Sequence, residues 1–86
     1  ITVASGVTLY VSNIPIMLVS GGTNIILPNA VKNSGFEYTI KLVTTGSTTI
    51  STMLSQTIDG VTTKILSTQY QWVKVKSDGL NWYILS

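Results

Sequence analysis

The feature that most constrains the fold is the frequent interruption of short apolar runs by turn-forming residues. Val, Ile and Thr dominate the runs. Their branched side chains lose rotamer freedom in a helix and pack well on pleated strands. Turn-forming residues therefore mark the ends of strands. The breaks are Ser5-Gly6, Gly21-Gly22, Pro28-Asn29, Asn33-Ser34-Gly35, Thr45-Gly46-Ser47, Asp59-Gly60 and Asp78-Gly79.

The runs between these breaks predict an all-β fold, a small antiparallel β-sandwich or barrel-like head. The predicted strands are Thr2–Val3, Thr8–Ser12, Ile16–Val19, Ile25–Leu27, Phe36–Val43, Thr48–Thr52, Thr63–Leu66, Gln71–Lys76 and Asn81–Leu85. In the clearest predicted strand, Phe36–Val43, apolar and polar residues alternate from Phe36 to Leu42. This alternation predicts one buried face and one solvent-exposed face. The predicted core residues of this strand are Phe36, Tyr38, Ile40 and Leu42. The helix candidate Thr52–Gln56 is too short to be more than a turn.

Composition predicts that this chain, taken as a single domain over residues 1–86, assembles with itself. A small core needs disulfides, a metal or oligomerisation to support it, and the 86 residues contain no Cys and no His. Only 9% of the residues are charged and 44% are hydrophobic, against about 25% charged in an ordinary domain. The longest apolar stretch, Ile14–Val19, is far too short to span a membrane.

The end of the chain predicts a hairpin with two different faces. A two-residue turn at Asp78-Gly79 would place Val75 opposite Trp82 and Trp72 opposite Leu85. One face would then be entirely apolar and form core, namely Val73, Val75, Trp82 and Ile84. The other face would mix Trp72, Tyr83 and Leu85 with Lys74 and Lys76. A solvent-exposed strand face rarely carries a Trp beside a Leu, so this face is predicted to contact a subunit or ligand.

Four motifs resemble the C-terminal β domains of viral and bacteriophage fibre, spike and tail proteins. They are Leu27-Pro28, the strand from Gly35 to Lys41, Thr57-Ile58-Asp59-Gly60, and the closing Ser77-Asp78-Gly79 with Trp82 and Ile84. The resemblance covers about residues 23–86. It implies a homotrimeric head on the virion surface that aligns the three chains of the trimer or attaches to a host. Residues 1–20 either belong to this head or connect it to an upstream shaft.

The polar residues predict binding rather than catalysis. Glu37, Asp59 and Asp78 are the only carboxylates, and the two Asp-Gly pairs fit turn geometry better than a Ca²⁺ site. We expect no enzymatic activity, cofactor or metal. Without Arg, we expect no nucleic-acid partner.

The aromatic residues leave two functions open. Tyr70, Trp72 and Tyr83 could pack subunits together or stack on sugars. Lys74 and Lys76 could meet an acidic glycan or discourage strand aggregation. A carbohydrate-binding module or adhesin fragment is therefore the alternative to a fibre tip.

Overall fold

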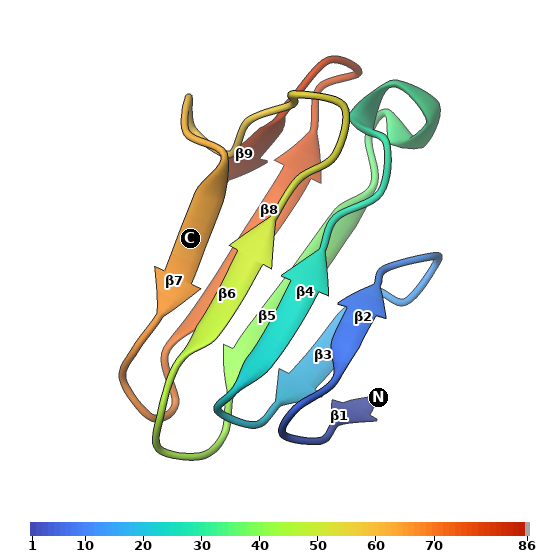
Figure 1. Cartoon of the computed structure of the whole chain (residues 1–86). Coiled ribbons are helices and arrows are strands. Elements are labelled where there is room, and N and C mark those ends of the chain that lie inside the picture. The colour runs from blue at the N-terminus through green and yellow to red at the C-terminus, as the bar shows by residue number, and fades with distance from the viewer. Residues whose placement is uncertain (86) are drawn as a thin grey trace.

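Nine β-strands and one short 3₁₀-helix make up residues 1–85, the part of the chain that the computed structural model describes (Figure 1). The predicted all-β class is therefore confirmed. In chain order the elements are β1 Thr2–Val3, β2 Thr8–Tyr10, β3 Ile16–Val19, β4 Thr23–Ile26, η1 Ala30–Asn33, β5 Glu37–Leu42, β6 Thr48–Ser51, β7 Thr63–Leu66, β8 Trp72–Ser77 and β9 Trp82–Ile84.

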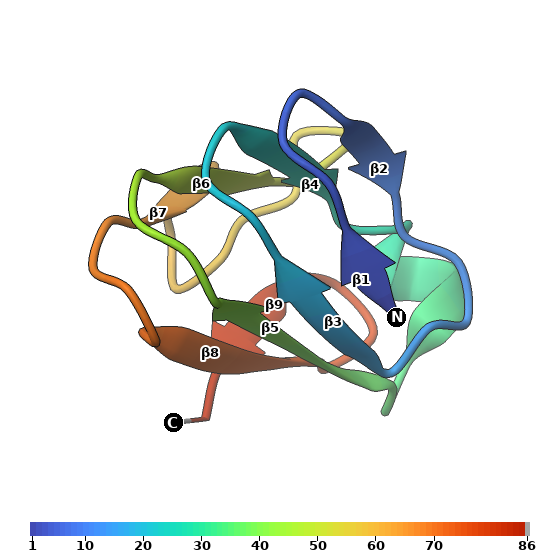
Figure 2. The ribbon, with the colours of Figure 1, turned by 90° about the horizontal axis from the view of Figure 1, so that it is seen from below.

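The strands form two stacked sheets, and the first six alternate between them (Figure 2). Sheet A has the order β1-β3-β5-β8-β9 and sheet B the order β2-β4-β6-β7. Strands β1, β3 and β5 run parallel, as do β2, β4 and β6. The chain thus winds through three coils of a right-handed β-solenoid, the hand that parallel crossovers favour. The predicted antiparallel sandwich is wrong for this part of the chain.

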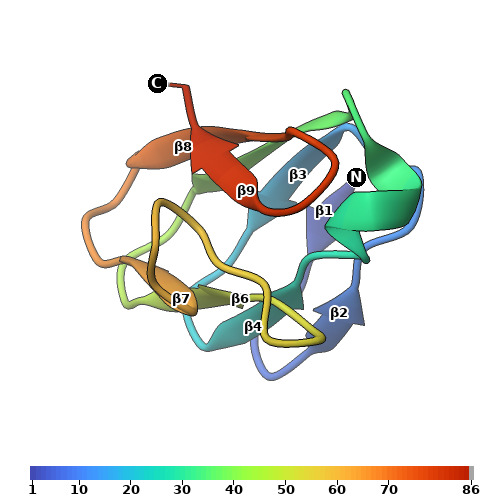
Figure 3. The ribbon, with the colours of Figure 1, turned by 90° about the horizontal axis from the view of Figure 1, so that it is seen from above.

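The last three strands are antiparallel and convert both sheets into mixed ones. Strand β7 turns back on β6, β8 pairs with β5, and β9 pairs with β8. The outer edge of β9 is covered by the β6–β7 connection, which Figure 3 shows beside it. The Trp82 N–H donates to the Thr57 carbonyl at 2.8 Å, and the Asp59 N–H donates to the Trp82 carbonyl at 3.1 Å. This cover blocks further strand pairing at that edge.

Glycine corners allow the coils to stack closely. The Gly6 N–H donates to the Gly22 carbonyl, and the Gly22 N–H donates to the Ser47 carbonyl. A Cβ on Gly21 would collide with the Thr45 carbonyl oxygen, so only glycine fits there. Gly6 and Gly22 lie one coil apart, each followed three residues later by Leu or Ile. The third coil has Ser47 at the equivalent position, so this spacing alone does not specify the solenoid.

Apolar side chains from both sheets fill the space between them. The buried core residues are Val3, Val11, Met17, Val19, Ile25, Leu27, Ala30, Tyr38, Ile40, Leu42, Ile50, Ile58, Leu66, Val73, Val75 and Trp82. Among the residues predicted as core, Ile84 is half-buried and Phe36 is 46% exposed. Phe36 has the inward phase of its strand, but β5 begins only at Glu37. It lies just before β5, where its carbonyl accepts the Ser77 N–H at 3.1 Å, and its ring centre is 6.5 Å from that of Tyr38.

The 3₁₀-helix η1, which the sequence reading missed, closes one end of the sandwich. Asn29 caps it by accepting the Val31 N–H at 3.0 Å, the usual duty of Asn at a helix start. The Ser77 hydroxyl donates to the Ala30 carbonyl at 2.6 Å, and the Trp82 indole N–H donates to the Pro28 carbonyl at 3.2 Å. These bonds tie η1 to β8 and β9. Within residues 1–85 no helix is long and apolar enough to cross a membrane.

The hairpin between β8 and β9 differs from its predicted register by two residues. Ser77 pairs with Trp82, and Val75 with Ile84, because the connection spans Asp78–Asn81 rather than two residues. The two-residue turn with positive φ at both positions occurs instead at Asp59-Gly60, with φ of 50° and 85°. An even shift keeps each side chain on its predicted face. It does remove Leu85 from its predicted place opposite Trp72.

Candidate functional site

The outer face of sheet A gathers most of the residues that the sequence singled out. Across β5 and β8, Glu37 lies opposite Lys76 and Lys41 opposite Trp72. The row through Lys76 continues to Tyr83 on β9. The face is exposed or half-buried throughout; its members are Ile16, Leu18, Glu37, Thr39, Lys41, Trp72, Lys74, Lys76, Tyr83 and Leu85. Large apolar side chains therefore cover both sides of this sheet.

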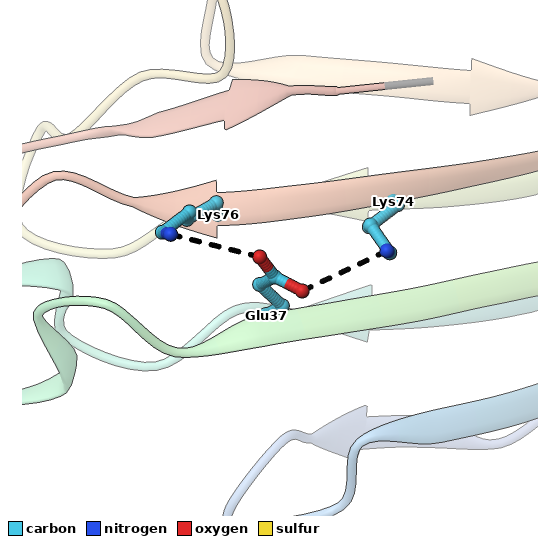
Figure 4. Close-up of polar contacts among 3 residues, drawn as sticks. All are labelled: Glu37, Lys74 and Lys76. Atoms are coloured by element: carbon cyan, nitrogen blue, oxygen red, sulfur yellow. Dashed lines mark ion pairs between the residues drawn. The ribbon is translucent and has the colours of Figure 1, made fainter.

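The Glu37 carboxylate forms ion pairs with two lysines on this face. Glu37 Oε1 lies 3.7 Å from Lys74 Nζ, and Glu37 Oε2 lies 3.6 Å from Lys76 Nζ (Figure 4). All three side chains are 41–46% exposed, so water screens the pairs and they add little stability. Their main effect is to neutralise part of the positive charge beside β9.

At the other end of the face, Lys41 lies among aromatic rings. Its Nζ is 5.8 Å from the centre of the Tyr70 ring, within range of a cation–π contact. Trp72 is its cross-strand neighbour and is 44% exposed. Among the described residues, Lys41 has no carboxylate within 4.0 Å. This end of the face therefore combines a positive charge with two accessible rings.

The turn that presents Tyr70 is held firmly by hydrogen bonds. Tyr70 has a φ of +71°, uncommon for a bulky residue. Its N–H donates to the Leu42 carbonyl at 2.6 Å. The Gln71 side-chain oxygen accepts the N–H groups of Ser67 and Thr68 at 2.9 and 3.2 Å. Tyr70 is 61% exposed, so the turn fixes a ring that faces outward.

Two hollows lie near the Glu37–Lys76 ion pair. One, of about 280 Å³, is lined by Lys76, Ser77, Asp78, Tyr83 and Leu85. The other, of about 210 Å³, is lined by Asn13, Pro15, Phe36, Glu37 and Tyr38. Tyr83 and Leu85 were predicted as contact residues, and the structure places both at one hollow.

The carboxylates of the two Asp-Gly pairs are occupied by backbone groups. Asp78 Oδ1 accepts the N–H groups of Asn81 and Leu80, both at 2.9 Å, and these bonds hold its pKa below the usual range. Asp59 Oδ1 accepts the Ile84 N–H at 3.0 Å. No group of three acidic side chains suited to a metal occurs in residues 1–85. The expected lack of catalysis stays a prediction.

The structure thus divides the predicted contact residues into two groups. Tyr70 and Trp72 lie at the Lys41 end, whereas Tyr83, Leu85 and Lys76 lie by the larger hollow. Sequence reasoning missed Lys41 because the alternation of its strand predicts a plain solvated position. It also missed Leu18, although the run Ile16–Val19 is apolar on both faces.

The chain matches no family model, no curated protein and no solved structure.

Proposed function

We propose that the chain is a virion structural module, the head or tip of a viral or bacteriophage fibre or spike. It assembles as a homotrimer and contacts the host surface. The observation that carries this proposal is that sheet A carries large apolar side chains on its outer face as well as on its inner face. Val73, Val75 and Trp82 fill the core, while Tyr83 and Leu85 face outward at the larger hollow. A small chain without cysteines gains stability by burying such a face in an assembly.

The hollow beside Tyr83 and Leu85 is the part of this face best suited to subunit contact. Its volume of about 280 Å³ can receive a large side chain, and such buried anchors dominate interface energies. Leu80, in the adjoining turn, is 67% exposed and extends the apolar surface. The Lys74 and Lys76 charges nearby are compensated by Glu37, which lowers the repulsion between subunits.

Sedimentation equilibrium at micromolar concentration tests this proposal. We expect a species of three times 9.3 kDa. Leu85→Ser should weaken the trimer at least about tenfold, because it removes an apolar anchor. Ile65→Ser is the matched control, since Ile65 is similarly exposed on sheet B, and should leave the mass unchanged. A monomer with full β signal and cooperative melting would refute the trimer.

A carbohydrate-binding module is the second candidate, and the pair of exposed rings at Tyr70 and Trp72 favours it. Such rings stack on the apolar faces of sugars. A module of this kind would act without forming a trimer. A clean monomer that binds glycans would therefore support it over the fibre tip.

A further inference from the structure

We propose that Trp72, Tyr70 and Lys41 form a binding site for an anionic sugar, a saccharide that carries a carboxylate or a phosphate. The inference rests on the host-contact part of the proposed function and names the ligand class. We call these three residues the aromatic–lysine site. It lies on the outer face of sheet A, at the end away from Glu37.

The charge distribution identifies an anionic ligand. Glu37 lies within 3.7 Å of both Lys74 and Lys76, so one negative charge is shared between them. Lys41 has no such partner among residues 1–85 and instead lies 5.8 Å from the Tyr70 ring centre. A carboxylate or phosphate placed at Lys41 would complete a charge pair that the protein itself does not supply.

The rings identify a ligand with an apolar face. Trp72 is 44% exposed although it is the largest side chain on β8, and Tyr70 is 61% exposed. Two accessible rings beside a cation suit a sugar, whose C–H groups cover a ring while its charged group reaches the lysine. Leu18, which lies opposite Lys41 on β3, extends the apolar floor on the other side.

The backbone indicates that the site is preformed. Tyr70 has a φ of +71°, a conformation that persists in a bulky residue only when its surroundings impose it. The Leu42 carbonyl, which accepts the Tyr70 N–H, and the Gln71 side chain provide that restraint. A backbone already held in place at Tyr70 lowers the entropy that the turn loses on binding.

The corrected hairpin register separates this site from the proposed subunit contact. Leu85 donates its N–H to the Lys74 carbonyl, so it lies next to Lys74 rather than opposite Trp72. The hollow lined by Tyr83 and Leu85 includes neither Trp72 nor Lys41. A subunit contact confined to that hollow would leave the aromatic–lysine site accessible.

The two tryptophans make the proposal directly testable by NMR. The indole N–H of Trp82 is buried and bonded to Pro28, whereas Trp72 is exposed. Titration with oligogalacturonate, N-acetylneuraminic acid or glucose 6-phosphate should shift the Trp72 indole signal saturably and leave that of Trp82 in place. The carboxylate and phosphate probes together show which anion is preferred. Neutral galacto-oligosaccharide should bind at least about tenfold more weakly.

Two variants and a control assign the site. Lys41→Met should remove the preference for the anionic probes over the neutral one, and Trp72→Ala should abolish binding measured by calorimetry. Lys32→Met removes an exposed lysine from η1, outside both the aromatic–lysine site and the hollow, and should leave the preference intact. If none of the anionic probes shifts the Trp72 signal, the proposal is wrong.

Parallel sedimentation separates this proposal from the trimer. A trimer that binds no anionic sugar refutes the aromatic–lysine site and leaves the assembly proposal standing. A monomer that binds an anionic sugar supports the aromatic–lysine site and refutes the trimer. If Trp72→Ala lowers the assembled mass, Trp72 belongs to the subunit contact and the sugar site is refuted.

Discussion

The outer faces of the two sheets differ far more than their inner faces. Both inner faces are apolar, since they share one core. The outer face of sheet A carries three lysines against one glutamate, with Trp72 and Tyr83. The corresponding face of sheet B carries no charged residue within its paired strands; its members are Thr8, Tyr10, Asn24, Ile26, Thr49, Ser51, Thr63 and Ile65.

The contrast teaches which residues the fold requires and which it leaves free. Burial favours apolar residues at inward positions, so both sheets fill most of these positions with aliphatic or aromatic side chains. Outward positions on a strand need only tolerate water. Small hydroxyl and amide groups predominate on sheet B. Sheet A instead exposes rings and charges, and this difference is why we propose its outer face as the interaction surface.

The largest expected effect on stability comes from replacing the inward-facing tryptophan of sheet A, with the outward-facing one as its comparison. Trp82 is fully buried and lies 5.6 Å from the Tyr38 ring, so Trp82→Ala should lower the free energy of unfolding by about 3–5 kcal/mol. Trp72 faces outward, and Trp72→Ala should cost below about 1 kcal/mol. Urea denaturation measures both.

Tyr38→Phe is the control for the inner position. The Tyr38 hydroxyl is buried and has no hydrogen-bond partner in the described part of the chain. Removing it should leave the stability equal or raise it. Equal losses for Trp82→Ala and Trp72→Ala would mean that inward and outward positions of sheet A are equivalent.

A smaller effect is expected at the hydroxyl pair of Thr23 and Thr48, which is buried inside sheet B. Thr48 is buried, with its hydroxyl 2.7 Å from that of Thr23 and 3.1 Å from the Ser20 carbonyl. Thr48→Val should therefore cost about 1 kcal/mol. Thr49→Val, one residue along and outward, should cost close to nothing. If thermal melting shows the same loss for both, the hydroxyl pair does not help the coils to stack.

The smallest effect concerns Asp78, whose turn joins β8 to β9 on sheet A. Its pKa is lowered by the Asn81 and Leu80 N–H groups, so the folded state holds its proton less tightly than the unfolded state. The resulting stabilisation is complete above the ordinary aspartate pKa and is lost as the pH falls through the lowered folded value. Asp78→Ala should slightly lower the Tm at pH 7, and the difference should shrink as the pH falls below about 4.

Asp78→Asn sharpens this last test. Asn retains a side-chain oxygen that can accept the same N–H groups, but it does not titrate in this range. Its Tm difference from Asp78→Ala should therefore persist in acid. A difference between the parent and Asp78→Ala that does not change with pH would show that the carboxylate charge is irrelevant to this turn.

Local chemistry in the sequence was enough to locate the strands. The predicted Thr2–Val3, Ile16–Val19 and Thr63–Leu66 have the same bounds in the structure, and the other strands differ by a few residues at their ends. The alternation from Tyr38 to Leu42 predicted the buried face of β5. The faces of β8 and β9 were also predictable, because the two-residue error in register is even and leaves the facing of side chains unchanged.

The pairing of strands was decided only by the tertiary structure. Turn residues report where a strand ends but not whether the next strand lies beside it or in the other sheet. Parallel stacking depends on contacts between coils, such as Gly22 with Ser47 and Thr23 with Thr48, which lie far apart in sequence. The same long-range pairing brought Lys41 to Tyr70 and Trp72. The sequence by itself determined a β-rich chain with an apolar core and a distinctive final hairpin. The solenoid, the register and the composition of the outer face followed from which strands became neighbours, because that choice depends on the packing of the whole core.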